Sequence, residues 1–332
     1  MQAQNPKPSP AAQQVLSGVI RRDGIEDMSG AVRNFFDLEA VQLEPGVCRC
    51  QIDFVAAGQV FFYREHYPLR TQLVGELLHH RFGFAIPEEG PGIKFDGEQM
   101  DGCRLASAMT GEQMDVFAPG GLKQFVVLID HAHLLRLAEE TNLPWAVQQA
   151  LRPGRSTMPL VSKPSAVSAL SRRLRQVLRQ AAAGRLQMEP AALEDWIYAE
   201  ALSILDITGH PCGRPPAAVV VRRATEIADA QPGPWRIASL CSQLHVSPST
   251  LQYAFKTITG LSPHAFFLHR KLNRARVALL RAHPGESKVT DIAVDLGFSE
   301  LGRFSVRYRR LFGESPSETL RRSPRISTFG GF

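Results

Sequence analysis

The side chains best suited to recognition chemistry lie on one face of a short segment with helical periodicity, residues 248–258. The inward side chains of this segment are apolar: Leu251, Ala254, Phe255 and Ile258. Its outward side chains are polar or aromatic: Ser249, Thr250, Gln252, Tyr253 and Lys256. Glutamine can pair with adenine through two hydrogen bonds, serine and threonine pair with several base edges, and lysine suits phosphates. We therefore expect the first four residues to contact DNA bases and Lys256 to contact the DNA backbone.

A second face of this kind lies 53 residues later and has a different composition. Three candidate base-contacting residues stand at the positions that correspond to Ser249, Gln252 and Tyr253; they are Gly302, Ser305 and Val306. Four arginines, which suit phosphates, surround them: Arg303, Arg307, Arg309 and Arg310. Because glycine and valine offer few hydrogen bonds to a base, we expect the first face to specify the DNA sequence and the second mainly to anchor the protein.

Two copies of one helical unit position these faces. The first copy reads Leu240-Cys241-x-x-Leu244-x-Val246-Ser247, followed by Leu251 and Phe255. The second reads Ile292-Ala293-x-x-Leu296-x-Phe298-Ser299, followed by Phe304 and Tyr308. The offset rises from 52 to 53 just after the serine, where a turn can absorb the added residue. A helix, a turn, and a second helix capped by Ser247 with Pro248 in its first turn form a helix-turn-helix, whose second helix can enter the major groove.

Residues 263–281 join the copies; their apolar residues have near-helical spacing, and Pro263 suits the first turn of a helix. About 19 residues at a rise of ~1.5 Å form a rod of roughly 28 Å. Recognition helices held at that distance can reach successive major-groove faces of one duplex, which lie about 34 Å apart. The repeat therefore predicts a helical DNA-binding domain over residues 218–322, with helix-turn-helix motifs at about 237–258 and 289–312.

Several motifs in this region resemble the AraC/XylS family of transcription regulators. They are Gly260-Leu261-Ser262-Pro263, Leu272-x-x-Ala275, Ile292-Ala293-x-x-Leu296-Gly297-Phe298-Ser299 and Phe304-x-x-x-Tyr308-x-x-x-Phe312-Gly313-x-x-Pro316-Ser317. The resemblance covers residues 219–321 and is most similar to the branch of XylS-type and ethanolamine-operon regulators. It implies double-stranded promoter DNA and RNA polymerase as partners, a small-molecule effector, and activation of transcription. In that family a base-reading residue is often expected at the Gly302 or Val306 position.

Charge is distributed unevenly along the 332-residue chain. Residues 214–332 contain 18 Lys/Arg and 8 Asp/Glu, whereas residues 1–213 contain 20 and 24, so the net charges are +10 and −4. This split is typical of a nucleic-acid-binding module joined to a domain with another role. No apolar run is long enough to span a membrane, and residues 1–18 are predicted to be a disordered tail rather than a secretory signal.

Residues 19–130 contain short extended runs separated by Gly/Pro clusters, among them 50–55, 59–63, 82–86, 94–95 and 124–129. This pattern predicts an antiparallel β-sandwich or barrel, and the family resemblance implies a jelly-roll-like (cupin-like) sensor domain. The segment 61–67 combines aromatic and polar side chains, as ligand pockets do, so Tyr63 and Arg64 are candidate effector-pocket residues. Packing in the barrel core is an equally good interpretation of each aromatic residue.

Helical periodicity begins at residue 131, with predicted helices at 131–141, 166–183 and 190–208. Residues 19–208 would thus form one sensor and dimerisation domain, β-rich to residue 130 and helical from 131 to 208. The last two helices could form a homodimer surface or cover the open face of the barrel. The Gly/Pro-rich segment 209–217 is the predicted linker, and residues 323–332 are a tail. The chain is therefore expected to be an α+β protein of two domains.

The sequence gives little support to metal or catalytic chemistry. The five cysteines, Cys48, Cys50, Cys103, Cys212 and Cys241, lack zinc-finger spacing; packing is the simplest role for Cys48 and Cys50, and a redox role is the alternative. The adjacent His79 and His80 would point in opposite directions on a strand. The sequence contains no nucleophile elbow, phosphate-binding glycine loop or Walker lysine. We expect no catalytic residue, no metal and no cofactor.

The prediction is a sequence-specific DNA-binding regulator, located in the cytoplasm and nucleoid-associated when bound, that responds to a small molecule held by its amino-terminal domain. A second interpretation is a ligand-independent DNA-binding regulator whose amino-terminal domain serves dimerisation or binds a protein partner. The two interpretations differ in one structural respect, because the second requires a filled barrel without a pocket.

Overall fold

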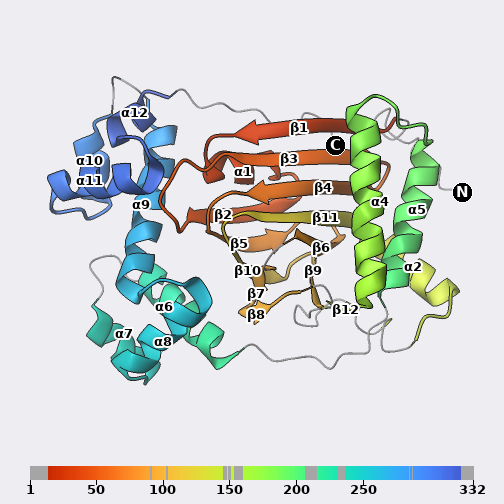
Figure 1. Cartoon of the computed structure of the whole chain (residues 1–332). Coiled ribbons are helices and arrows are strands. Elements are labelled where there is room, and N and C mark those ends of the chain that lie inside the picture. Colours follow the sequence, from red (N-terminus) through yellow and green to blue (C-terminus); the bar gives the residue numbers. More distant parts are fainter. Residues whose placement is uncertain are drawn as a thin grey trace, which may run out of the picture.

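The computed structural model describes residues 14–89, 92–101, 104–144, 148, 151–152, 160–205, 215–230, 236–283, 285 and 287–322. Its amino-terminal region consists of strands flanked by helices, and its carboxy-terminal region is helical (Figure 1). This arrangement agrees with the predicted α+β class. Among the described residues, no helix is long and apolar enough to cross a membrane. In the same residues, no group of three or more His, Cys, Asp and Glu side chains could hold a metal ion.

Two antiparallel sheets form the amino-terminal region. The larger sheet contains, in spatial order, β1 (Leu16–Arg22), β3 (Cys50–Ala57), β4 (Val60–Tyr67), β11 (Leu122–Asp130), β6 (Arg81–Glu89), β9 (Arg104–Met109) and β12 (Leu160–Val161). The smaller sheet contains β2 (Phe36–Gln42), β5 (Thr71–Leu77), β10 (Gln113–Ala118), β7 (Lys94–Phe95) and β8 (Glu98–Gln99). Helix α1 (Ile25–Ala31) lies between β1 and β2 in the chain.

Both faces of the larger sheet are apolar over much of their area, because successive side chains of a strand point to opposite faces. Its inner face packs against the smaller sheet, with Ile52 and Phe61 meeting Leu77 and Met114 in one buried cluster. Its outer face is covered by α2 (His131–Glu140), α4 (Pro164–Ala182) and α5 (Pro190–Ile204) (Figure 1). The amino-terminal region is therefore a layered structure of helices, sheet and sheet.

The apolar stripes of α4 and α5 are buried by this packing. The buried residues of the two stripes are Val167, Leu170, Leu174, Val177, Leu178, Leu193, Ile197, Ala201, Ile204 and Leu205, and all belong to the cluster on the outer face of the larger sheet. Of the two roles predicted for these helices, covering a face of the β-structure is confirmed. A homodimer contact through α4 and α5 would have to use their outward, largely polar faces.

Seven helices form the described carboxy-terminal region: α6 (Pro216–Ala230), α7 (Ile237–Leu244), α8 (Pro248–Thr259), α9 (Pro263–Arg281), α10 (Val289–Asp295), α11 (Leu301–Phe312) and α12 (Pro316–Leu320). Helix α9 connects two separate cores and lies beside β2 of the smaller sheet (Figure 1). Its first half packs against α6, α7 and α8 through Phe266 and Phe267. Its second half packs against α10, α11 and α12 through Leu272 and Leu279. The predicted rod over residues 263–281 is confirmed.

Several predicted boundaries need correction. The tail predicted over residues 1–18 ends too late, because Leu16 to Gly18 pair with β3 as the first residues of β1. The linker predicted over residues 209–217 also ends too late, since α6 begins at Pro216. His79 and His80 are not on a strand; both have left-handed φ values, 60° and 53°, in the turn between β5 and β6. Residues 1–13, 206–214 and 323–332, with Cys103 and Cys212, lie outside the described residues.

Cys48 and Cys50 are both buried and free, and their sulfur atoms lie 3.2 Å apart. The hydrogen bond to Cys48, together with burial, raises the pKa of the Cys50 thiol. The thiolate is the reactive form of cysteine, and these surroundings disfavour it. The geometry supports packing as the role of this pair.

A buried acid, Glu65, lies between the two sheets on β4. The hydroxyl of Tyr67 donates a hydrogen bond of 3.0 Å to its carboxylate, and the Gln124 amide donates a second. Burial nevertheless dominates, and it raises the pKa of Glu65 from 4.5 to about 7, with the two hydrogen bonds opposing the shift. The folded chain thus holds a proton on Glu65 at pH values where the unfolded chain has released it.

The free energy of unfolding should therefore depend on pH through Glu65. Its contribution is fully present below about pH 4.5 and is lost as the pH rises through about 7. The total loss should be on the order of 3 kcal/mol, because one pKa unit corresponds to about 1.4 kcal/mol. Urea unfolding of the wild type and of Glu65→Gln at pH 5 and pH 8 measures this effect. Between pH 5 and pH 8 the wild type should lose more stability than the variant. Equal losses would show that the pKa of Glu65 is not raised in the folded chain.

Candidate nucleic-acid interface

Helix α8 presents the predicted first recognition face. Ser249, Thr250, Gln252, Tyr253 and Lys256 are all exposed, whereas Leu251, Ala254, Phe255 and Ile258 are buried. As predicted, Ser247 caps the helix, and its hydroxyl accepts a hydrogen bond of 3.1 Å from the backbone N–H of Thr250. The same hydroxyl lies 2.9 Å from that of Ser249 and 2.8 Å from that of Thr250. Ser249 and Thr250 would have to leave the Ser247 hydroxyl before they could bind a base. Among the hydrogen bonds described, the side chains of Gln252 and Tyr253 form none that would have to break.

Helix α11 presents the second face. All seven predicted contact residues are exposed: Gly302, Arg303, Ser305, Val306, Arg307, Arg309 and Arg310. The Ser305 hydroxyl donates a hydrogen bond of 3.1 Å to the carbonyl of Leu301, so it is turned toward its own helix. Arg303 forms an ion pair of 2.9 Å with Glu300, whereas the other three arginines form no ion pair with a described residue. The face is strongly basic and offers few hydrogen-bonding groups suited to bases.

The backbone turn of the two helix pairs repeats closely. His245, after α7, and Gly297, after α10, both adopt left-handed conformations, with φ values of 54° and 77°. In the first pair the N–H of Val246 donates to the carbonyl of Cys241 at 3.1 Å, and in the second the N–H of Phe298 donates to that of Ala293 at 2.9 Å. The added residue of the second copy is Glu300, which precedes α11 and forms no side-chain cap. The insertion is thus confined to the turn, as the sequence predicted.

Each of the two predicted recognition faces carries one highly exposed apolar side chain. Tyr253 is 68% exposed and Val306 is 70% exposed, and they are the most exposed large hydrophobic side chains of the described residues. The two residues are 53 positions apart, which is the repeat offset, so they occupy corresponding sites on α8 and α11. Both are held directly opposite the buried stripe of their helix, where contact with a groove would be made.

The amino-terminal region contacts the carboxy-terminal ends of both helices. The Lys94 ammonium group donates a hydrogen bond to the carbonyl of Thr257 in α8. The Gln42 amide and the backbone N–H of Gly46 donate to the carbonyl of Leu311 in α11, at 2.8 and 2.9 Å. Carbonyls in the last turn of a helix lack partners within the helix, so these donors satisfy them. The contacts leave the outward faces of α8 and α11 free, and no sequence pattern indicated them.

Tyr63 and Arg64, the predicted effector-pocket residues, point to opposite faces of β4. Tyr63 is buried between the sheets, where it lines a cavity of about 70 Å³. Arg64 points to the outer face of the larger sheet and forms ion pairs with Glu88, at 2.6 Å, and Asp53, at 3.7 Å. The structure therefore does not bring the two side chains together in one pocket.

Comparison with known proteins places the carboxy-terminal region in a family. Residues 240–322 match the family model described as a helix-turn-helix domain. The chain is 37% identical over 106 residues to the probable thc operon regulatory protein of Rhodococcus erythropolis, and 40% identical over 75 residues to the XylDLEGF operon transcriptional activator 2 of Pseudomonas putida. These segments are 32% and 23% of this chain and 32% and 48% of those proteins. The chain belongs to the AraC/XylS family through this domain.

A solved structure of a probable AraC family transcriptional regulator from Rhodopseudomonas palustris CGA009 is 36% identical and covers 32% of this chain and 97% of its own, with a TM-score of 0.30. The AraC-like transcriptional activator CuxR aligns over 78% of this chain and 95% of its own at 11% identity, with a TM-score of 0.42. The curated relatives are transcription regulators, not enzymes, and the chain spans about a third to a half of the length of the first two. The assignment of this AraC/XylS-type chain rests on the sequence matches to its carboxy-terminal domain.

The cap of α8 can be tested against its counterpart in α11. We expect Ser247→Ala to lower the free energy of unfolding by about 1 kcal/mol, because an N–H in the first turn of α8 loses its partner. Ser299→Ala should have little effect, since α11 begins one residue later without a side-chain cap. Chemical unfolding of both variants measures the difference. Equal destabilisation would show that the two turns are capped alike.

Proposed function

We propose that this protein is a sequence-specific transcriptional activator that binds double-stranded promoter DNA through two helix-turn-helix motifs, α7–α8 and α10–α11. The exposed pair Tyr253 and Val306 carries the proposal. Single exposed apolar side chains are common on protein surfaces and need no explanation. Two of them at repeat-related positions, each on a face that is otherwise polar or basic, suit contact with thymine methyl groups in the major groove.

The two motifs would divide the work of recognition. On α8, Gln252 and Tyr253 are the best candidates for reading bases, with Ser249 and Thr250 assisting once they leave Ser247. On α11, Val306 would contact a thymine methyl group while Arg307, Arg309 and Arg310 bind phosphates. With the Val306 contact, α11 would touch a base as well as phosphates, whereas its composition alone indicated mainly phosphate binding. Arg303 contributes less to phosphate binding, because Glu300 neutralises it.

The amino-terminal region would be a jelly-roll-like sensor domain that binds a small-molecule effector and supports a homodimer. Its two antiparallel sheets are compatible with such a fold. RNA polymerase would be the partner on the promoter, and the cytoplasm the place of action, as for a chromosomal regulator. A ligand-independent regulator is the second candidate, and the small cavity between the sheets favours it, since about 70 Å³ is well below the roughly 300–1,000 Å³ of ligand pockets.

Selection of bound sequences from a random duplex library with the purified full chain tests the DNA-binding proposal. A motif with two conserved blocks about one helical turn apart is the expected result, because α9 holds two recognition helices. Recovery of duplexes without any common motif would reject sequence-specific binding.

Two substitutions separate base reading from phosphate binding. Gln252→Ala should lose about 1–3 kcal/mol of discrimination at one position of the selected site. Arg307→Ala should weaken binding to matched and unmatched duplexes alike and reduce the salt dependence by about one phosphate contact. Fluorescence anisotropy at several salt concentrations measures both quantities. Loss of base discrimination in Arg307→Ala, without loss of general affinity, would contradict this division.

The contact of Val306 can be tested by removing a single methyl group from the DNA. Each thymine of the selected site is replaced in turn by deoxyuridine, which differs only in lacking that methyl. One replacement in the block bound by α11 should weaken wild-type binding about fourfold, the value of one buried methyl group. Val306→Ala should bind the thymine and deoxyuridine duplexes with similar affinity. A variant that stays as sensitive as the wild type would exclude this contact.

A further inference from the structure

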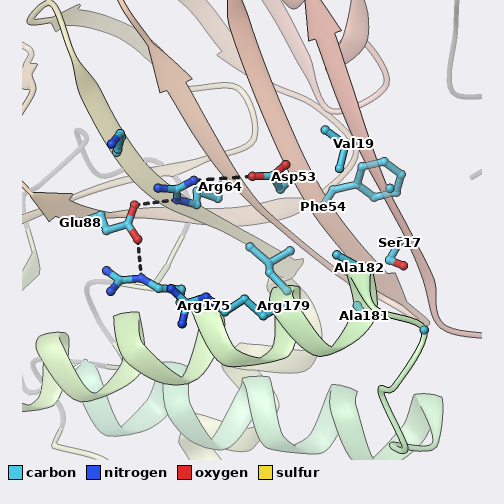
Figure 2. Close-up of a pocket in the computed structure, with 14 residues that line it drawn as sticks. Ser17, Val19, Asp53, Phe54, Arg64, Glu88, Arg175, Arg179, Ala181 and Ala182 are labelled. Carbon is cyan, nitrogen blue, oxygen red and sulfur yellow. Dashed lines mark hydrogen bonds and ion pairs between the residues drawn. The ribbon is translucent and has the colours of Figure 1, made fainter.

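A cleft larger than the interior cavity lies outside the sandwich, between the larger sheet and the carboxy-terminal half of α4 (Figure 2). Its volume is about 700 Å³, ten times that of the cavity between the sheets. This volume falls within the range of roughly 300–1,000 Å³ that is usual for ligand pockets. The sheet wall is formed by β1, β3, β4, β6 and β11, and the opposite wall by α4. Of these two spaces, the one large enough for a small molecule is on the helix-covered side of the sheet.

The charged part of the cleft centres on a buried carboxylate. The Glu88 side chain is only 2% exposed and bridges Arg64 on β4, at 2.6 Å, and Arg175 on α4, at 2.5 Å (Figure 2). Asp53 lies 3.7 Å from the same Arg64. The two acidic residues of the cleft are thus committed to these two arginines. The bridge also ties the helix to the sheet, which gives the cleft a fixed wall.

Two further cations line the cleft without such a partner. Lys123 on β11 and Arg179, one turn beyond Arg175 on α4, form no ion pair with any described residue. The lining therefore has four basic and two acidic residues, a net excess of positive charge. Burial lowers the pKa of the neighbouring His66, and the positive charges of Lys123 and Arg64 lower it further. An anion entering the cleft would find positive charge that the protein has not neutralised.

The other part of the cleft is apolar. Val19 on β1 is 45% exposed, although it is a large hydrophobic residue, and it lines the cleft on the same face of the sheet as its strand neighbour Asp53. Ala181 and Ala182 of α4 close this part from the helix side (Figure 2). In Figure 2 the Glu88 and Arg175 pair lies at one end of the cleft, and Val19 lies at the other. A ligand that fits both ends must be amphipathic.

We propose that this cleft binds a small organic anion, a carboxylate with an apolar body. Its body would pack against Val19, Ala181 and Ala182, and its carboxylate would pair with the unneutralised Lys123 and Arg179. The inference rests on the proposed regulatory function, for which it names the class of effector and a site outside the sandwich. Because the cleft lies between α4 and the sheet, an occupant would contact both and alter how tightly the helix is held.

The test is calorimetric titration of the full chain with matched pairs of probes: hexanoate, octanoate and 3-phenylpropanoate against the corresponding amides. The pairs share an apolar body and differ in charge. The carboxylates should bind, and each amide should bind at least about tenfold more weakly, because a charge-assisted hydrogen bond is lost. Equal affinity within every pair, or no binding by any carboxylate, overturns the proposal.

Variants locate the bound anion. Lys123→Gln and Arg179→Gln should each weaken carboxylate binding about tenfold, whereas Arg172→Gln, on the exposed side of α4, should not. Ala106→Val narrows the interior cavity and should leave the affinity unchanged. Loss of binding in Ala106→Val, with full binding in the other two variants, would place the anion between the sheets and reject the cleft.

The same preparations, titrated with the selected duplex in the absence of carboxylate, separate this proposal from the regulatory function. DNA binding without carboxylate binding rejects the cleft alone. Carboxylate binding that depends on Lys123 and Arg179 in a chain that binds no specific duplex supports the cleft and rejects the proposed regulator.

Discussion

The polar face of α9 is the constraint on which the arrangement of the molecule depends. Arg270, Asn273 and Arg276 follow one another at intervals of three residues and are only 3–5% exposed. Buried charges and amides are costly unless every one is paired. Arg270 pairs with Glu39 at 3.2 Å and with Asp229 at 2.9 Å. The helix can therefore occupy its position only when the amino-terminal region supplies partners along it.

Asn273 and Arg276, the other two buried polar residues of this face, also have partners in the amino-terminal region. The Asn273 side chain accepts a hydrogen bond from the backbone N–H of Gln42 at 2.9 Å and donates one to its carbonyl at 3.0 Å, in the manner of a paired strand. Arg276 pairs with Glu26 at 2.9 Å and with Glu314 at 2.6 Å. Each residue thus joins α9 to the amino-terminal region, and Arg276 joins it to the second helical core as well. The orientation of α8 and α11, the two helices proposed to contact DNA, is coupled to the docking of that region.

Local patterns in the sequence predicted the carboxy-terminal domain well. The repeat located both helix pairs, the cap at Ser247 and the single added residue, because these depend on periodicity and turn chemistry within a few residues. The contacts of α9 could not be predicted in this way. Arg270 and Arg276 sit in a segment that looks like a solvated basic rod, and their partners are distant in sequence. Similarly, alternation on β4 implies that Tyr63 and Arg64 face opposite ways, but not what each face meets.

The paired residues also change how the basic charge of the carboxy-terminal region should be understood. Its net charge of +10 counts Arg270, Arg274 and Arg276, which pair with acidic residues and hold the molecule together. On α8, Lys256 is the single cation of the recognition face, and it also caps its own helix at the Gly260 carbonyl, 3.3 Å away. On α11, Arg307, Arg309 and Arg310 are exposed without described ion-pair partners. The charge available to phosphates is therefore concentrated on α11, and this asymmetry, more than the total charge, favours anchoring by the second motif and reading by the first.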